Sequence, residues 1–244
     1  MIDVYWLEQA GGDLPAGDAW LSRAEADRLG AMRFPKRRAD WTLGRWTAKR
    51  SLAAYLDLPA DSRSLARIEI RAASSGAPEV FFGGEPAPVT LSISHRAGWA
   101  ACAVAGPEAA LGCDLEIVEP RGDAFAGDYF TGQEQELLAR ASAADRFRLL
   151  ALLWSAKESA LKALRVGLRL DTRCVVVDPF VEHVSGESDW RALRAHHDGQ
   201  VFHGWWRQTG DLVRTLVAAP APASPVSANA GRRCMRYHGD AGQE

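Results

Sequence analysis

The hydrophobic and polar positions of this 244-residue chain follow two different periods in different segments. Alternation with a period of two is typical of half-buried strands. It predicts strands at residues 2–8, 67–71, 89–95, 99–106, 110–118, 175–177, 200–208 and 212–219. Apolar positions spaced three and four apart predict helices at residues 22–32, 38–56, 132–144 and 145–166. Ser22 and Glu25 form the capping-box pattern that marks the start of the first helix.

The order of the predicted elements indicates an α+β fold. Helices and strands do not alternate strictly, which favours antiparallel sheets over a doubly wound parallel sheet. The order strand, helices, strands occurs twice, so we expect two similar halves at residues 1–108 and 109–219, although no clear sequence repeat accompanies them. From Pro220 the chain is rich in Ala, Pro and Ser, and this composition predicts a disordered tail over residues 220–244.

Composition and charge narrow the class of protein. Hydrophobic residues make up 47% and charged residues 25%, as in an ordinary globular protein. The net charge of −2 gives no general attraction to polyanions, so we expect no nucleic-acid partner. The first residues do not resemble a signal peptide, and no run approaches the roughly 18 apolar residues of a membrane span. Four scattered cysteines without a C-x-x-C pair fit a reduced, cytoplasmic setting.

The predicted helix over 38–56 belongs to a strongly basic segment. Residues 33–50 contain seven basic residues and a single acid, Asp40. Such a helix is suited to an anionic ligand or an acidic protein, but a solvated helix face has the same pattern.

Two carboxylates interrupt the apolar strand predicted at 110–118. Asp114 and Glu116 are two positions apart in LGCDLEIVEP, so in a strand both side chains point to one face. Taken alone, these two acids are more simply explained as the solvated face of a half-exposed sheet. Close carboxylates repel unless a positive group lies between them, and a hard divalent cation with a phosphate-bearing substrate would provide that charge.

The segment WSAKESALKAL adds charged groups to one helix. Glu158 lies one turn from Trp154 and one turn from Lys162. A single lysine–glutamate pair in a helix is usually surface decoration. Together with Asp114 and Glu116, however, these residues match what a metal-dependent reaction on a phosphate needs.

Three motifs make the chain resemble the 4′-phosphopantetheinyl transferases, and in particular the larger, surfactin-type class that modifies secondary-metabolite carrier proteins. SISH (92–95) resembles the family's Ser-His segment, GCDLE (112–116) its G-x-D-x-E motif, and WSAKESALKAL (154–164) its W-x-x-K-E-x-x-x-K helix. FPKRRADWTLGRWTAKR (34–50) also resembles the basic helix that precedes them. The order and spacing of the motifs fit the family over residues 1–219.

The resemblance implies an activity, a fold and ligands. The two halves would be related by a pseudo-twofold, with the active site in the cleft between them. The reaction would move the phosphopantetheine arm of coenzyme A to a serine of an apo acyl or peptidyl carrier protein and release 3′,5′-adenosine bisphosphate. Magnesium would be required, and because one chain would hold the whole cleft, a monomer is expected.

The resemblance also implies roles for individual residues. Asp114, Glu116 and Glu158 would hold Mg²⁺, and Glu158 would act as the general base. Lys162 would stabilise the charge that develops on phosphate, with Lys157 as the second candidate. Ser94 and His95 would contact the phosphates of coenzyme A.

One position departs from the family pattern. Ala77 stands where the family often has a lysine that faces the cofactor, so that phosphate contact must come from elsewhere. Arg37, Arg38 and Arg45 are the candidates, and the sequence does not choose among them. Glu134 matches a recurrent acid of the family and is expected near the metal.

Two other functions share parts of this pattern. A carrier-binding module that has lost catalysis would not need the converging charges of Asp114, Glu116, Glu158 and Lys162. A magnesium-dependent nucleotide phosphohydrolase would use the same carboxylates, but would need no surface for a protein acceptor.

Overall fold

The computed structural model describes residues 1–181 and 189–228. Its helices are α1 (Arg23–Gly30), α2 (Pro35–Tyr55), α3 (Ser62–Ala66), α4 (Asp123–Tyr129), α5 (Gly132–Arg140) and α6 (Ala143–Ala163). The strands before the middle of the chain are β1 (Tyr5–Ala10), β2 (Ile68–Ala72), β3 (Pro78–Phe82), β4 (Glu85–Pro86), β5 (Thr90–Arg96) and β6 (Trp99–Ala105). Those after it are β7 (Ala110–Ile117), β8 (Val176–Asp178), β9 (Arg191–His197), β10 (Gln200–Thr209), β11 (Leu212–Ala219) and β12 (Val226–Ser227).

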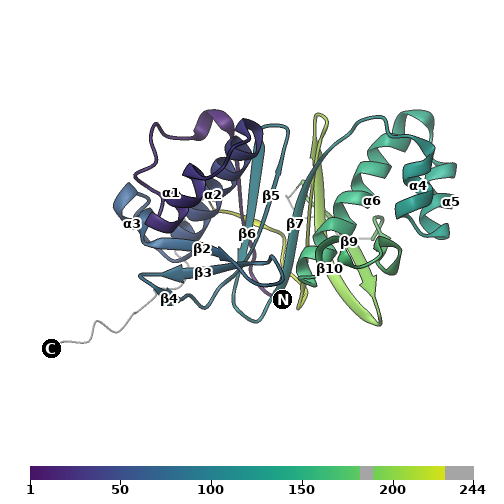
Figure 1. Cartoon of the computed structure of the whole chain (residues 1–244). Coiled ribbons are helices and arrows are strands. Elements are labelled where there is room, and N and C mark those ends of the chain that lie inside the picture. Colours follow the sequence, from purple (N-terminus) through teal and green to yellow (C-terminus); the bar gives the residue numbers. More distant parts are fainter. Residues whose placement is uncertain (182–188, 229–244) are drawn as a thin grey trace.

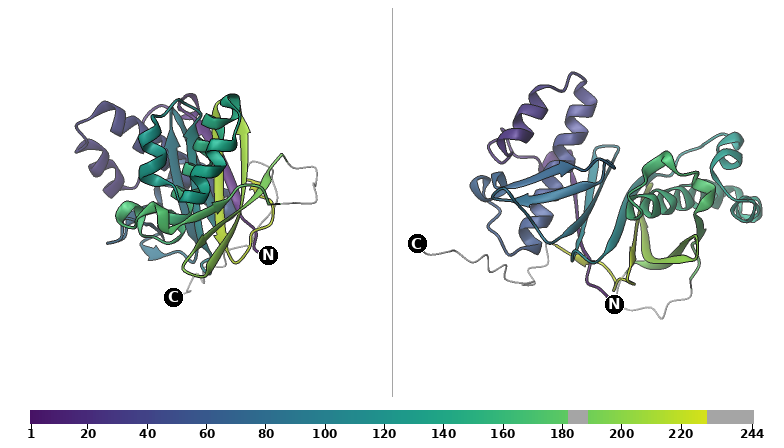
Figure 2. Two further views of the ribbon diagram at one scale, coloured as in Figure 1. Left: turned by 90° about the vertical axis from the view of Figure 1, so that its right-hand side faces the viewer. Right: turned by 60° about the horizontal axis from the view of Figure 1, so that its bottom comes forward.

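The molecule has four layers, helix, sheet, sheet and helix (Figure 1). A four-stranded sheet in the order β12-β1-β6-β5 is covered by α2, and a five-stranded sheet in the order β7-β11-β10-β9-β8 is covered by α6. A small sheet, β2-β3-β4, belongs to the first half and packs against the apolar cluster of α2. The right view of Figure 2 shows the two halves side by side, each with its own long helix. The predicted α+β class is confirmed.

Three apolar clusters hold the layers together. One lies between α2 and its sheet, a second lies between α6 and its sheet, and a third fills the space between the two sheets. In the third cluster Trp6 of β1 and Cys113 of β7 are both almost fully buried. The two halves therefore share an interior, and their relative position is fixed by packing.

The two halves repeat the same arrangement. The strand order β1-β6-β5 corresponds to β7-β11-β10, and each helix of 21 residues covers the corresponding sheet. The structure also reveals a repeat that the sequence prediction missed, because WTAKRS (46–51) in α2 corresponds to WSAKES (154–159) in α6. Arg50 takes the position of Glu158, and Ala54 takes that of Lys162. Helix α2 therefore has no counterpart of Glu158 or Lys162.

A buried ion pair accompanies each of the two long helices. In the first half, Glu25 caps α1 at Ser22, accepts the N–H of Ile70 and lies 2.5 Å from Nζ of Lys49. The predicted capping box at Ser22 is confirmed. The carboxylate of Glu25 therefore joins α1, α2 and β2.

The ion pair of the second half has the same three kinds of contact. Glu134 caps α5 at Thr131, accepts the N–H of Val177 and lies 2.8 Å from Nζ of Lys157. Both lysine side chains are fully buried. Each ammonium also donates to two backbone carbonyls. That of Lys49 donates to Trp20 and Leu65, and that of Lys157 donates to Thr172 and Val175.

The end of the described chain corrects one prediction. A disordered tail from Pro220 is wrong for residues 220–228, because β12 pairs with β1 in parallel and extends the sheet of the first half. Backbone N–H groups of Ala223, Val226 and Ala228 donate to carbonyls of Ile2, Val4 and Trp6. Residues 229–244 of the predicted tail lie outside the described part of the chain. None of the helices in the described part is both long and apolar enough to cross a bilayer.

Candidate functional site

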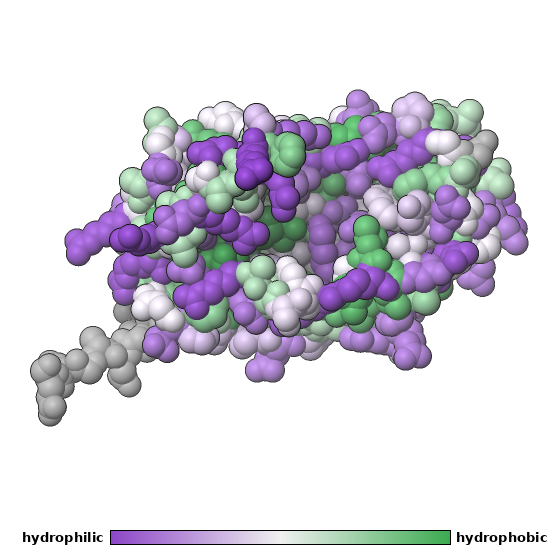
Figure 3. Space-filling view, in the orientation of Figure 1, coloured by the Kyte–Doolittle hydropathy of each residue, from purple (hydrophilic) through white to green (hydrophobic). Residues whose placement is uncertain are grey.

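A cavity of about 360 Å³ opens between the two halves. Its walls come from α2, β5, the turn before β3, β7 and the end of α6. Figure 3 shows the corresponding face, where hydrophobic surface is visible in a hollow surrounded by hydrophilic side chains. Apolar side chains such as Trp41, Leu91 and Leu111 line the cavity together with four potential cations, Arg45, His95, Lys162 and Arg165. This lining suits an anionic ligand that also carries apolar surface.

The glycine of the GCDLE motif sets the distance between β7 and α6. A Cβ atom on Gly112 would lie 1.8 Å from the carbonyl oxygen of Ser159 and 2.7 Å from the backbone nitrogen of Ala163. Any larger residue would therefore push the helix away from the strand. This close approach brings Lys162 and Glu158 of α6 next to Asp114 of β7.

Asp114 is buried, and each of its oxygens accepts hydrogen bonds. Oδ1 accepts from the hydroxyl of Ser94 and from Nζ of Lys162, both at 2.8 Å. Oδ2 accepts from the hydroxyl of Ser155 at 3.0 Å. Burial is the largest single influence on the pKa of Lys162 and lowers it, but the charge and hydrogen bond of Asp114, together with the nearby Cys113 and Glu158, outweigh burial and raise that pKa, so the lysine stays protonated.

Glu116 is held by aromatic and cationic groups. Oε1 accepts from the indole N–H of Trp154 at 3.1 Å, and Oε2 accepts from Arg121 at 3.0 Å. The guanidinium of Arg96 lies 3.4 Å from the same carboxylate. Burial raises the pKa of Glu116, and the nearby charge of Asp114 raises it further.

Glu158 completes the acidic cluster. Within residues 1–181 and 189–228, its carboxylate has neither a hydrogen-bond partner nor a salt bridge. Its pKa is raised by burial and then by the charges of Asp114 and Glu116, while Lys162 lowers it. The predicted proximity of the three carboxylates therefore exists in the fold. Their mutual repulsion is expressed in the raised pKa values of Glu116 and Glu158.

The donor set fits a hard divalent cation in chemistry, because it consists of carboxylate oxygens that repel one another. In their present orientations, no group of three acidic, His or Cys side chains of the described residues is arranged as a ready metal site. In these orientations Lys162 occupies Oδ1 of Asp114, and Arg121 occupies Oε2 of Glu116. An ion would compete with these cations for the same oxygens.

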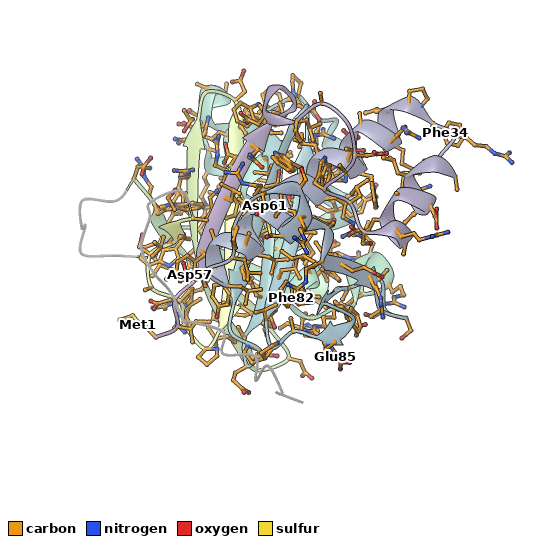
Figure 4. The ribbon with its side chains drawn as sticks, turned by 90° about the vertical axis from the view of Figure 1, so that its left-hand side faces the viewer. Met1, Phe34, Asp57, Asp61, Phe82 and Glu85 are labelled. Atoms are coloured by element: carbon orange, nitrogen blue, oxygen red, sulfur yellow. The ribbon has the colours of Figure 1, made fainter. Side chains whose placement is uncertain are left out.

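The cationic residues predicted from sequence separate into two groups. His95, Lys162 and Arg45 line the cavity. Arg45 is buried, and its guanidinium stacks on the ring of Trp41 at 5.1 Å. Its Nε has no hydrogen-bond partner among the described residues. Arg37 and Arg38 are exposed near the start of α2 and do not line the cavity. Figure 4 shows that the start of α2 projects from the body of the protein, with Phe34 at its outer end. The structure thus separates Arg45 from the two exposed arginines.

Two predicted contacts are corrected. Lys157 does not line the cavity, because its ammonium is fully buried and bonded to Glu134. Glu134, which was expected near the metal, instead binds Lys157 and the backbone N–H groups of Thr131 and Val177. Ser94 does not face the cavity, because its hydroxyl donates to Asp114 and accepts the N–H of Leu115. It connects β5 with β7 and orients a carboxylate.

Sequence reasoning missed several residues of the site. Arg165 lies just beyond the end of α6 in the left-handed backbone conformation, where helix periodicity gives no signal, and it lines the cavity. The sequence placed Trp154 one turn from Glu158 and gave no sign that its indole N–H donates to Glu116. Arg121 and Arg96 carry no local signal, since they meet Glu116 only through the loop after β7 and the end of β5.

The segment that carries the acidic cluster also matches a known family. Residues 110–215 match the model of the 4′-phosphopantetheinyl transferase superfamily. A comparison with curated proteins gives no significant match. The matched segment begins at β7, includes all of α6 and ends in β11 at Thr215, so it contains Asp114, Glu116, Glu158 and Lys162. The match indicates a transferase of the phosphopantetheinyl type.

Proposed function

We propose that this protein transfers the 4′-phosphopantetheine arm of coenzyme A to a serine hydroxyl of an apo acyl or peptidyl carrier protein. The observation that carries the proposal is the position of the cationic cavity, which meets the acidic cluster of the matched segment at Lys162. Coenzyme A is a nucleotide phosphate with an aromatic base and a long arm. A cavity lined by Trp41, Arg45, His95 and Arg165 offers groups for each of its charged and apolar parts.

The reaction balances with the residues at hand. The serine oxygen of the carrier forms a bond to the phosphorus that bears the arm, and the bond from that phosphorus to the bridging oxygen of the pyrophosphate breaks. The serine proton goes to Glu158, whose pKa is raised and whose carboxylate has no partner among the described residues, as suits a general base near neutral pH. The leaving group is 3′,5′-adenosine bisphosphate.

Lys162 faces the same region as a permanently protonated donor. When the phosphorus–oxygen bond breaks, negative charge develops on the leaving phosphate, and an oriented ammonium stabilises it. Arg45, together with His95 and Arg165, provides the remaining positive charge of the cavity. Arg45 takes over the phosphate contact that is missing at Ala77, because it is the only one of the three sequence candidates that lines the cavity.

Asp114, Glu116 and Glu158 would hold Mg²⁺, which supplies neutralisation of the pyrophosphate oxygens when bound. Lys162 and Arg121 occupy oxygens of Asp114 and Glu116 in this structure. These cations therefore stabilise the cluster in the same way that an ion would, and they are expected to move or share their partners when it binds.

One assay tests the proposal against its alternatives. Apo carrier protein is incubated with coenzyme A and Mg²⁺, and the intact mass of the carrier is measured. An increase by the mass of the phosphopantetheine arm supports the transferase, and its disappearance in Glu158→Ala ties the reaction to this site. Binding of carrier without a mass change would indicate a non-catalytic binding module. Consumption of coenzyme A without carrier would indicate a phosphohydrolase.

A further inference from the structure

A chain of buried hydroxyl groups ends on the carboxylate of Asp114. Ser155 of α6 donates to Oδ2 of Asp114, and the hydroxyls of Ser155 and Thr215 lie 2.8 Å apart. The hydroxyls of Thr215 and Ser159 lie 2.7 Å apart. All three hydroxyl residues are fully buried between α6 and β11.

The carboxylate fixes the direction of this chain. Asp114 is paired with Lys162, and an ionised carboxylate only accepts hydrogen bonds. Ser155 must direct its one proton to Asp114, so it accepts from Thr215. Thr215 in turn has no second proton and accepts from Ser159. Hydrogen bonds that run in one direction polarise each other, and this strengthens the bond at the end of the chain.

The repeat shows that buried hydroxyls at these helix positions do not by themselves form a continuous chain. In the first half, Thr47 stands at the position of Ser155 and Ser51 at that of Ser159. Thr47 donates to the backbone carbonyl of Leu43, and the hydroxyl of Ser51 faces the buried thiol of Cys102 rather than a second hydroxyl. The continuous chain is therefore present only in the half that carries the acidic cluster, within the part of the protein that the structure describes.

We infer that Ser155, Thr215 and Ser159 are positioning residues that fix the orientation of the Asp114 carboxylate for a divalent cation. The inference deepens the proposed function and rests on it. Oδ2 is directed by Ser155, while Oδ1 is directed by Ser94 and Lys162, so the plane of the carboxylate is set from both sides. Groups that orient a metal ligand from behind affect metal affinity by about 10- to 100-fold.

Thr215→Val tests the inference, because valine keeps the shape of threonine and removes the middle hydroxyl. The dissociation constant of Mn²⁺ is measured by calorimetry and electron paramagnetic resonance on the full chain. We expect Mn²⁺ to bind at least about 10-fold more weakly to Thr215→Val, and Thr215→Ser to stay within about threefold of wild type. In turnover assays the apparent KM for Mg²⁺ should rise, while kcat at saturating Mg²⁺ is largely kept.

Thr47→Val is the matched control, since it makes the same change at a fully buried helix position of the other half. It should leave Mn²⁺ affinity unchanged. Ser159→Ala removes only the far end of the chain and provides a second test if Thr215→Val does not fold. Wild-type Mn²⁺ affinity in folded Thr215→Val and Ser159→Ala would overturn the inference. A wild-type protein that transfers the arm but binds no Mn²⁺ would overturn it as well, whereas a wild type without transfer would instead refute the proposed function.

Discussion

The ammonium of Lys157 lies 2.8 Å from Oε2 of Glu134, and both side chains are sealed inside the second half. Burial lowers the pKa of Lys157, and the charge of Glu134 opposes that effect. A lysine in this position holds the start of α5, the carbonyls near β8 and α6 in one place. Lys157 is next to Glu158 in the sequence, but its ammonium is held in the buried ion pair with Glu134, so its effect on catalysis is indirect.

We expect Lys157→Ala to destabilise the protein by about 3–5 kcal/mol, since it leaves the Glu134 carboxylate buried without a partner. Thermal unfolding should show the loss, and the KM for coenzyme A of the folded fraction should stay near wild type. The double variant Lys157→Met/Glu134→Gln should recover part of the stability, because it removes both charges. A higher KM with an unchanged melting temperature would instead make Lys157 a phosphate ligand.

The raised pKa of Glu158 predicts a stabilising substitution. A carboxyl with a higher pKa in the folded state is bound to its proton more tightly there, so stability falls as pH rises through the range between the unfolded and folded pKa values. Glu158→Gln should therefore raise the melting temperature at pH 7–8 without divalent ions, by about 2–4 °C for each kcal/mol gained. The gain should vanish near pH 4, where the glutamate is also neutral, and activity should be lost. A lower melting temperature for Glu158→Gln at pH 8 would contradict the repulsion within the acidic cluster.

The pairing of β12 with β1 predicts that residues 222–228 contribute to the thermal stability of the protein. Removal of residues 222–244 takes away the backbone bonds from Ala223, Val226 and Ala228 to the carbonyls of residues 2, 4 and 6, so the melting temperature should fall by several degrees. The matched shorter deletion, which removes only residues 229–244, keeps all of these bonds and should melt like the full chain. Equal melting temperatures for the two truncations would show that β12 does not stabilise the sheet.

Much of the fold and the acidic cluster could be predicted because their signals are local. Period-two alternation marked β5, β6, β7, β10 and β11, and two acids two positions apart identified the face of β7. The remaining features depend on contacts between distant segments. Nothing near Lys157 distinguishes a buried partner of Glu134 from a phosphate ligand, and β12 has too few apolar residues to be predicted as a strand without β1 beside it.

The basic segment illustrates the same limit. The sequence placed Arg37, Arg38 and Arg45 in one helix, but only burial separates them. Arg45→Ala should raise the KM for coenzyme A about 10-fold or more, as expected for loss of a buried charged hydrogen bond. Charge reversal of both Arg37 and Arg38 should leave that KM unchanged, and any effect on the KM for carrier protein should shrink at high salt. Equal effects of the two variants on the KM for coenzyme A would remove the distinction.

Lys162 allows chemistry to be separated from binding. Its ammonium donates to Asp114 and to the carbonyl of Cys113, and it lines the cavity at the point where the cavity meets the acidic cluster. If it stabilises charge only as the phosphorus–oxygen bond breaks, its loss lowers kcat more than it raises KM. We expect Lys162→Ala to lower kcat by about 100-fold or more. Lys162→Arg should recover part of the rate, because arginine keeps the charge but not the compact ammonium.

Arg165→Ala is the appropriate comparison, since Arg165 lines the same cavity but has no contact with Asp114. It should raise the KM for coenzyme A and keep kcat. Steady-state kinetics with varied coenzyme A at saturating carrier protein measure both constants for both variants. The raised pKa keeps Lys162 protonated, so titration of this lysine should not affect the rate below about pH 9. Over that range the pH dependence of kcat should therefore have the same shape in wild type and in Lys162→Arg. An unchanged kcat with a tenfold higher KM in Lys162→Ala would assign Lys162 to binding alone, and general-base catalysis by Glu158 would then have to proceed without it.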